Sequence, residues 1–206
     1  MEVDAASERS AIRTRLQIFS TFPMRDEQRL DDLRARFNAG EKLKFIFFWS
    51  HESAGRGVDA SCFSQWYTAP FELDGERYAT AEHFMMAEKA RLFGDEGVRR
   101  RILAAPHPGA AKALGRQVQG FDEATWIRHR FATVVRASEA KFAQHAELRR
   151  FLAETHARVL VEASPLDRIW GIGLAHDDER ARDPNLWPGL NLLGFALMQV
   201  RAGFAA

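Results

Sequence analysis

The sequence has little of several features that would place a protein in a well-defined class. Its 206 residues include one cysteine, Cys62, which excludes an internal disulfide and a cysteine-based metal cluster. No stretch has the uninterrupted apolar length of a membrane-spanning helix. The first residues also lack the basic-then-apolar layout of a secretion signal. We therefore expect a reduced, cytoplasmic protein that has no membrane partner.

Charge and catalytic signatures are sparse as well. The formal net charge is only +1, so no overall field attracts nucleic acid, although a local arginine face remains open. The sequence has no P-loop, no dinucleotide-binding fingerprint and no HExxH zinc motif. Neither Cys62 nor Ser64 lies in a nucleophile elbow. The candidate chemistry must therefore come from ionisable and aromatic residues in the body of the chain.

The hydrophobic pattern predicts one helix-dominated α+β domain with a few short strands over residues 41–206. Residues 1–40 are predicted to be an N-terminal extension that carries one surface helix. The pattern places helices over 24–39, 80–94, 95–105, 110–116, 147–157 and 190–203, a long helix after Asp122, strands over 43–49 and 159–163, and a hairpin over 71–78.

The segment from Tyr78 to Arg91 is the first candidate for a site. Thr80 is a good N-cap, which places Glu82 in the first helical turn, where the positive helix end favours a carboxylate. Lys89 follows two turns later, about 10 Å along the axis. Glu82 alone is also compatible with a dipole-favoured surface residue, and Lys89 with a lysine whose stem covers apolar surface. An ionisable pair beside Met85 and Met86 nevertheless favours a site.

A second constellation follows the strand over 159–163. Asp167, Trp170, Gly171 and Gly173 lie in one turn, where glycines allow close backbone approach and free N–H groups could hold an anion. Trp170 could offer a flat face to a base or sugar. The alternative is a tight turn in which Trp170 packs in the core and Asp167 caps backbone amides.

Two weaker signals complete the candidates. The polar, glycine-rich loop around Arg56 suits phosphate binding, but an ordinary flexible loop has the same composition. Trp126 and Arg130 lie one turn apart on the long helix, either as a cation–π pair or as the wall of a pocket for an aromatic ligand. His83 is expected to be a hydrogen-bonded structural histidine, since no second ligand lies at metal-binding spacing.

Taken together, the segments resemble the NADAR (NAD and ADP-ribose associated) or YbiA-like N-glycosidase family. The resemblance covers roughly residues 43–201 in several separate motifs, which occur in order. They include Phe63-Ser64-Gln65-Trp66-Tyr67, Tyr78-x-Thr80-Ala81-Glu82-His83, Ala111-Lys112-x-Leu114-Gly115-Arg116, Phe121-Asp122-x-x-x-Trp126, Glu162-Ala163-Ser164-Pro165-x-Asp167-x-Ile169-Trp170-Gly171-Ile172-Gly173 and Trp187-x-Gly189-x-Asn191.

The resemblance implies hydrolysis of the bond between ribose and a nucleobase-like group, without a metal or another cofactor. Two substrate classes are associated with it: phosphorylated ribosylamino-pyrimidine intermediates of riboflavin synthesis, and ADP-ribose attached to guanine in DNA or RNA. A non-catalytic module that binds ADP-ribose or NAD is the alternative.

Roles follow from this resemblance and from the usual need for two carboxylates in glycosyl hydrolysis. Glu82, Lys89 and Asp167 are the predicted catalytic residues: Glu82 activates water or stabilises the sugar cation, Lys89 keeps Glu82 ionised or grips a phosphate, and Asp167 binds ribose hydroxyls or shares the acid–base work. The predicted substrate-binding residues are Trp126, Trp170, Gly171, Gly173, Arg56, Arg116 and Asn191.

Overall fold

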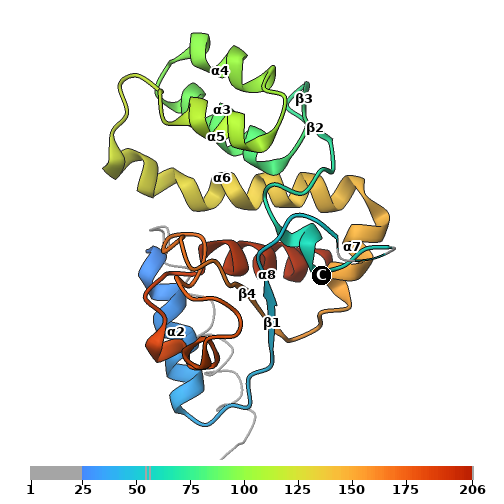
Figure 1. Cartoon of the computed structure of the whole chain (residues 1–206), viewed down its shortest axis with the longest axis vertical. Helices are drawn as coiled ribbons and strands as arrows, with labels where there is room; N and C mark the ends of the chain where they lie inside the picture. The colour runs from blue at the N-terminus through green and yellow to red at the C-terminus, as the bar shows by residue number, and fades with distance from the viewer. Residues whose placement is uncertain (1–24, 54, 56, 206) are drawn as a thin grey trace, which may run out of the picture.

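Helix α6 (Glu123–Gln144) runs through the middle of the molecule and separates two groups of elements (Figure 1). The computed structural model describes residues 25–53, 55 and 57–205, and predictions that fall on residues 1–24 or on Arg56 lie outside this part. Above α6 in Figure 1 lie the hairpin β2 (Phe71–Leu73) and β3 (Glu76–Tyr78), then α3 (Ala81–Leu92), α4 (Glu96–Leu103) and α5 (Pro108–Gly115). Below it lie α8 (Leu192–Ala205), α2 (Asp26–Asn38) and the strands β1 (Phe45–Phe48) and β4 (Val159–Glu162).

Strands β1 and β4 pair in parallel, with Phe45 opposite Val159 and Phe48 opposite Glu162. Parallel neighbours need a crossover connection, and here it contains the hairpin, helices α3 to α6 and α7 (Ala146–Ala153). Strand β4 is buried on both faces, as is usual for parallel strands. Its last residue, Glu162, lies at the C-terminal end of the strand, where the strand leaves the core.

The two faces of this small sheet serve two hydrophobic clusters. Leu160 faces the main core, which α3, α6 and α8 share, whereas Val159 and Val161 face a second cluster. Leu30 and Leu33 of α2 are buried in that second cluster. A buried ion pair of 2.8 Å between Asp26 and Arg130 also joins α2 to α6. Helix α2 is thus packed on the body of the protein, while the division of the chain at residue 40 stays a prediction.

Helix α3 is a central helix that is covered on nearly every side. The Thr80 side chain accepts a hydrogen bond from the His83 backbone N–H and so caps it. His83 is bonded at both ring nitrogens, to the Thr80 hydroxyl (2.8 Å) and to the Ala105 carbonyl (3.1 Å), as expected for a structural histidine. Phe84 is fully buried and contacts the rings of Phe71 and Tyr78 of the hairpin. Tertiary packing therefore fixes the first turn of α3, which carries Glu82.

The predicted fold class, α+β with mostly helices and a few short strands, is confirmed. None of the described helices is both long and apolar enough to cross a membrane.

Candidate active site

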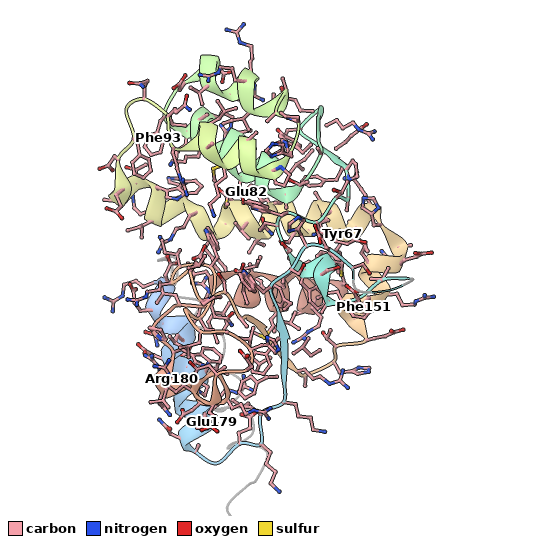
Figure 2. All side chains as sticks on the ribbon, in the orientation of Figure 1. Tyr67, Glu82, Phe93, Phe151, Glu179 and Arg180 are labelled. Atoms are coloured by element: carbon pink, nitrogen blue, oxygen red, sulfur yellow. The ribbon has the colours of Figure 1, made fainter. Side chains whose placement is uncertain are left out.

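A cavity of about 260 Å³ opens between the start of α3, the C-terminal end of α5, the loop before the hairpin and the turn after β4. Figure 2 marks Glu82, which lies in the first turn of α3 and is buried. Segments that are far apart in sequence therefore meet here. The polar and aromatic residues that line it are Ser64, Gln65, Trp66, Glu82, Lys89, Lys112, Arg116, Glu162, Asp167 and Trp170.

Unsatisfied polar atoms concentrate in this cavity. Among the described residues, six buried side-chain nitrogen or oxygen atoms have no hydrogen-bond partner, and three belong to its lining. They are Oε1 of Gln65, Oε1 of Glu82 and Oε2 of Glu162. Buried polar groups are normally paired, because leaving one unpaired costs roughly 1–3 kcal/mol. Three such atoms around one cavity indicate a site built for a polar ligand.

Glu82 is the most deeply buried acid of the cavity, with 2% of its surface exposed. Its backbone N–H donates to the Gln65 carbonyl at 3.0 Å, which anchors the first turn of α3. Burial raises the pKa of its carboxyl to about 7, and the Asp167 charge raises it further, while Lys112, the Trp66 indole N–H and Arg116 oppose the rise. A carboxyl with a pKa near neutrality can accept or release a proton under physiological conditions.

Two ionisable groups of the cavity were not singled out in the sequence. Glu162 ends β4, and burial raises the pKa of its carboxyl to about 8, with further contributions from Asp167 and Glu82. Lys112 of α5 is half-buried and is the cation that acts most strongly on Glu82. Both residues occur in the motifs that carry the family resemblance, but only the fold shows that they face Glu82.

Asp167 and Trp170 reach the cavity from the turn after β4. Asp167 Oδ1 accepts hydrogen bonds from the backbone N–H groups of Ile169 and Trp170, each at 2.8 Å. Asp167 thus caps backbone amides and also lines the cavity. Trp170 is half-buried and packs at the edge of the main core. The structural interpretation of this turn is thus met, whereas a functional role for Asp167 and Trp170 stays a prediction.

Lys89 lines the cavity, but its ammonium does not pair with Glu82. It donates to the Gly115 carbonyl at 2.9 Å and lies 4.1 Å from the centre of the Phe121 ring. Burial lowers its pKa. Lys89 fixes the C-terminal end of α5, next to the exposed Arg116. The idea that Lys89 holds Glu82 ionised is not supported by this geometry, because Lys112 and Arg116 are the cations that lower the pKa of Glu82.

The glycines of the second constellation have a packing role. A Cβ on Gly171 would lie 2.8 Å from the Glu162 carbonyl oxygen, and one on Gly173 would lie 2.9 Å from the Pro188 ring. Gly173 also has a φ of +71°, which favours glycine. Neither is part of the cavity lining. The expected close backbone approach is present, whereas anion binding by these glycines stays a prediction.

Asn191 lies behind the cavity. It is fully buried, and its carboxamide accepts from Glu162 N at 3.0 Å and donates to Leu160 O at 2.9 Å. It therefore holds the end of β4, and through it Glu162.

Trp126 is half-buried at the edge of the main core and is absent from the cavity lining. Its neighbour Arg130 pairs with Asp26. Trp126 therefore does not form a wall of this cavity, and a role for it in substrate binding stays a prediction.

A larger cavity, of about 470 Å³, lies elsewhere, between α2 and α6. Its walls include Phe131, Val135 and several arginines, and Arg29 lies 3.5 Å above the Phe131 ring. None of the unpartnered buried atoms found among the described residues comes from its walls. The smaller cavity is therefore the better candidate for chemistry.

Within the described residues, no group of three or more His, Cys, Asp or Glu is arranged to hold a metal ion.

Comparison with known proteins identifies the family. The family model of the NADAR domain matches residues 47–205. N-glycosidase R617 of Acanthamoeba polyphaga mimivirus is 40% identical over 166 residues, which cover 78% of this chain and 96% of that protein. N-glycosidase YbiA of Escherichia coli (strain K12) is 34% identical over 147 residues, 71% of this chain and 81% of that protein.

The fold agrees with this assignment. The NMR structure of the E. coli protein YbiA matches with a TM-score of 0.64 and 28% identity, and the match covers 91% of this chain and 90% of that one. The chain therefore belongs to the NADAR domain family and is an enzyme of the N-glycosidase class.

Proposed function

We propose that the cavity hydrolyses the N-glycosidic bond of a phosphorylated ribosyl substrate and that Glu82 is its general base. The observation that carries this proposal is the buried, unpartnered Glu82 oxygen in a cavity that also holds a second unpartnered carboxyl oxygen. A module that only bound ADP-ribose or NAD would gain nothing from an acid whose pKa is near neutrality. Such a group is useful where a proton must move.

In the proposed reaction, water attacks C1′ of the ribosyl group while the C1′–N bond breaks. The proton of that water passes to the Glu82 carboxylate, and the negative charge of the site stabilises the sugar cation that develops. The Oδ1 atom of Asp167 is already engaged by backbone N–H groups. We propose that Oδ2 of Asp167 accepts hydrogen bonds from the ribose hydroxyls.

The size of the cavity limits how much of the substrate it encloses. Sites that enclose a drug-sized ligand measure roughly 300–1,000 Å³, whereas this cavity measures about 260 Å³. We therefore place the ribosyl group and the leaving base inside, between Trp66 and Trp170. The phosphate lies at Lys112 and the exposed Arg116, where ammonium and guanidinium groups suit it. Lys89 keeps that end of α5 in position.

Gln65 provides a contact for the base. Its Oε1 is buried and unpartnered in the described part of the chain. As an acceptor it suits an N–H group, which guanine and amino-pyrimidines both present on their edges. The two substrates proposed for the site are ADP-ribosyl-guanine in DNA or RNA and a phosphorylated ribosylamino-pyrimidine intermediate of riboflavin synthesis. Both contain a ribosyl N-glycoside, an amino-bearing base and a phosphate, which are the groups that the proposed contacts bind.

The test is a parallel turnover assay on both substrates with wild type, Glu82→Gln and Glu139→Gln. Glu139 is exposed on α6 and serves as the matched control. We expect wild type and the control to release the free base from at least one substrate, and Glu82→Gln to be slower by about 10²–10⁴-fold. Turnover by Glu82→Gln at the wild-type rate would refute the role of Glu82.

A further inference from the structure

The backbone of Glu162 is held in place by hydrogen bonds to two other segments of the chain. Its N–H donates to Asn191 Oδ1 at 3.0 Å, and its carbonyl accepts from Ile172 N at 2.9 Å. The next residue, Ala163, donates to the Phe48 carbonyl at 2.8 Å. Asn191 accepts the bond from Glu162 N in a left-handed conformation, with φ of +55°, inside the core. The position of the Glu162 side chain is therefore set by bonds on both sides of the strand end.

One oxygen of the Glu162 carboxyl is buried without a hydrogen-bond partner among the described residues. Oε2 of Glu162 is buried and makes no hydrogen bond to any described residue, although the cavity wall includes cations. Oε1 of Glu82, whose residue is 2% exposed, is in the same situation in the same cavity. Two buried acids with a purely structural role would be expected to form hydrogen bonds or ion pairs with neighbouring residues. Each of these two acids instead lines the cavity and has one buried oxygen without a hydrogen-bond partner among the described residues.

The surroundings of the two acids differ. Glu82 lies in the first turn of α3, where the positive end of the helix dipole favours its ionised form, and it interacts with the Trp66 indole N–H. Glu162 lies at the end of a strand and has no helix end of its own. The charged groups that act on it are Asp167 from its own turn, Glu82 from α3 and Lys112 from α5, two acids against one base.

This arrangement favours one retained proton. Asp167 Oδ1 accepts from two backbone N–H groups, and the Asp167 charge raises the pKa of both Glu82 and Glu162. If Glu82 and Glu162 were ionised as well, three negative charges would face one cavity. Like charges at close range hold a proton on one of the carboxyls. The group with the fewest compensating donors, Glu162, keeps it, and burial and the Asp167 charge raise the pKa of both carboxyls.

We propose that Glu162 is the proton donor to the leaving nitrogen, acting with Glu82 as the base, an inference that rests on the proposed function. As the C1′–N bond breaks, the Glu162 proton passes to the nitrogen that takes the bonding electron pair. Water forms the new C1′–O bond and gives its proton to Glu82. The site then holds ionised Glu162 and protonated Glu82, and transfer of that proton through solvent restores the starting state. Atoms and charge balance without any co-reactant.

The decisive measurement is the pH dependence of kcat/KM for wild type, Glu162→Gln and the control Glu139→Gln, on whichever substrate wild type hydrolyses. A required acid makes activity fall as the pH rises through its pKa, here about 8. We expect Glu162→Gln to be at least 100-fold slower and to lack the alkaline fall, while the acidic limb from Glu82 remains. Activity within threefold of wild type, or an unchanged alkaline limb, would overturn the proposal.

A second measurement separates this inference from the proposed function. The infrared spectrum at pH 7 should contain a protonated-carboxyl C=O band in wild type and Glu139→Gln that is weaker in Glu162→Gln. Circular dichroism and the thermal midpoint establish that the variant is folded. If wild type hydrolyses neither substrate, the proposed function fails, and the band still reports whether Glu162 holds a proton. An equal band in all three proteins would refute the retained proton and with it the donor role.

Discussion

Replacing Glu82 by glutamine should increase stability at alkaline pH, because the wild-type carboxylate must ionise in a buried position. Burial raises the pKa of Glu82 from 4.5 to about 7 in the folded protein. Between these values the folded state binds a proton that the unfolded chain has released. The contribution to stability is therefore full below about pH 4.5 and is lost as the pH rises through about 7. Glutamine does not titrate, so the variant has no such loss.

The size of the effect follows from the shift. One pKa unit corresponds to about 1.36 kcal/mol, so the change from 4.5 to about 7 is worth about 3 kcal/mol once the pH exceeds both values. Between about pH 5 and about pH 8.5, wild type should lose about 2.5 kcal/mol of this contribution. The Glu82 charge also raises the pKa of Glu162. Its removal therefore relieves the second acid and acts in the same direction.

Urea unfolding of wild type, Glu82→Gln and the exposed control Glu139→Gln at both pH values measures this contribution. The free energy of unfolding of Glu82→Gln, taken relative to wild type, should rise by about 2.5 kcal/mol from the acidic to the alkaline condition. The control should show no such change. If the difference between variant and wild type stays within about 0.5 kcal/mol across the range, Glu82 does not titrate as its burial requires.

Three further changes test the surroundings of the site. Asp26→Asn leaves a buried guanidinium on α6 without its ionised partner at 2.8 Å, and the free energy of unfolding in urea should fall by about 3 kcal/mol. Gly194→Ala places a Cβ 2.0 Å from the Leu160 carbonyl oxygen, a backbone atom that cannot move without shifting β4. The thermal midpoint should therefore fall by about 10 °C. Lys112→Met removes the cation that most lowers the pKa of the general base, so the acidic limb of the kcat/KM profile should move to higher pH. An unchanged free energy, midpoint or limb would contradict the corresponding assignment.

The elements of the fold were predictable because local signals agree with the packing. Thr80 and Asp122 cap their helices as expected, and the Asp74-Gly75 turn joins β2 to β3. The parallel pairing of β1 with β4 was not predicted. More than a hundred residues separate these strands, and nothing local in either strand specifies its partner. That pairing places Glu162 beside the start of α3.

The site was only partly predictable for the same reason. Glu82, Asp167 and Trp170 carried local signals, a capped first turn and a glycine-bearing turn, and all three line the cavity. Glu162 and Lys112 carried none, since an acid at a strand end and a lysine on a short helix are ordinary surface patterns. Their significance arises only from packing, which partly buries them and places them in one cavity.

The two acids of the cavity come from elements whose ends differ electrically, and this difference separates their roles. The N-terminus of a helix offers a positive potential, which stabilises an ionised carboxylate. The end of a strand offers no such potential, so an acid there keeps its proton longer when it is buried. The fold brings the start of α3 and the end of β4 together around one cavity. In the proposed mechanism these two glutamates act as base and acid, because the surroundings and not the residue type set the order in which they ionise.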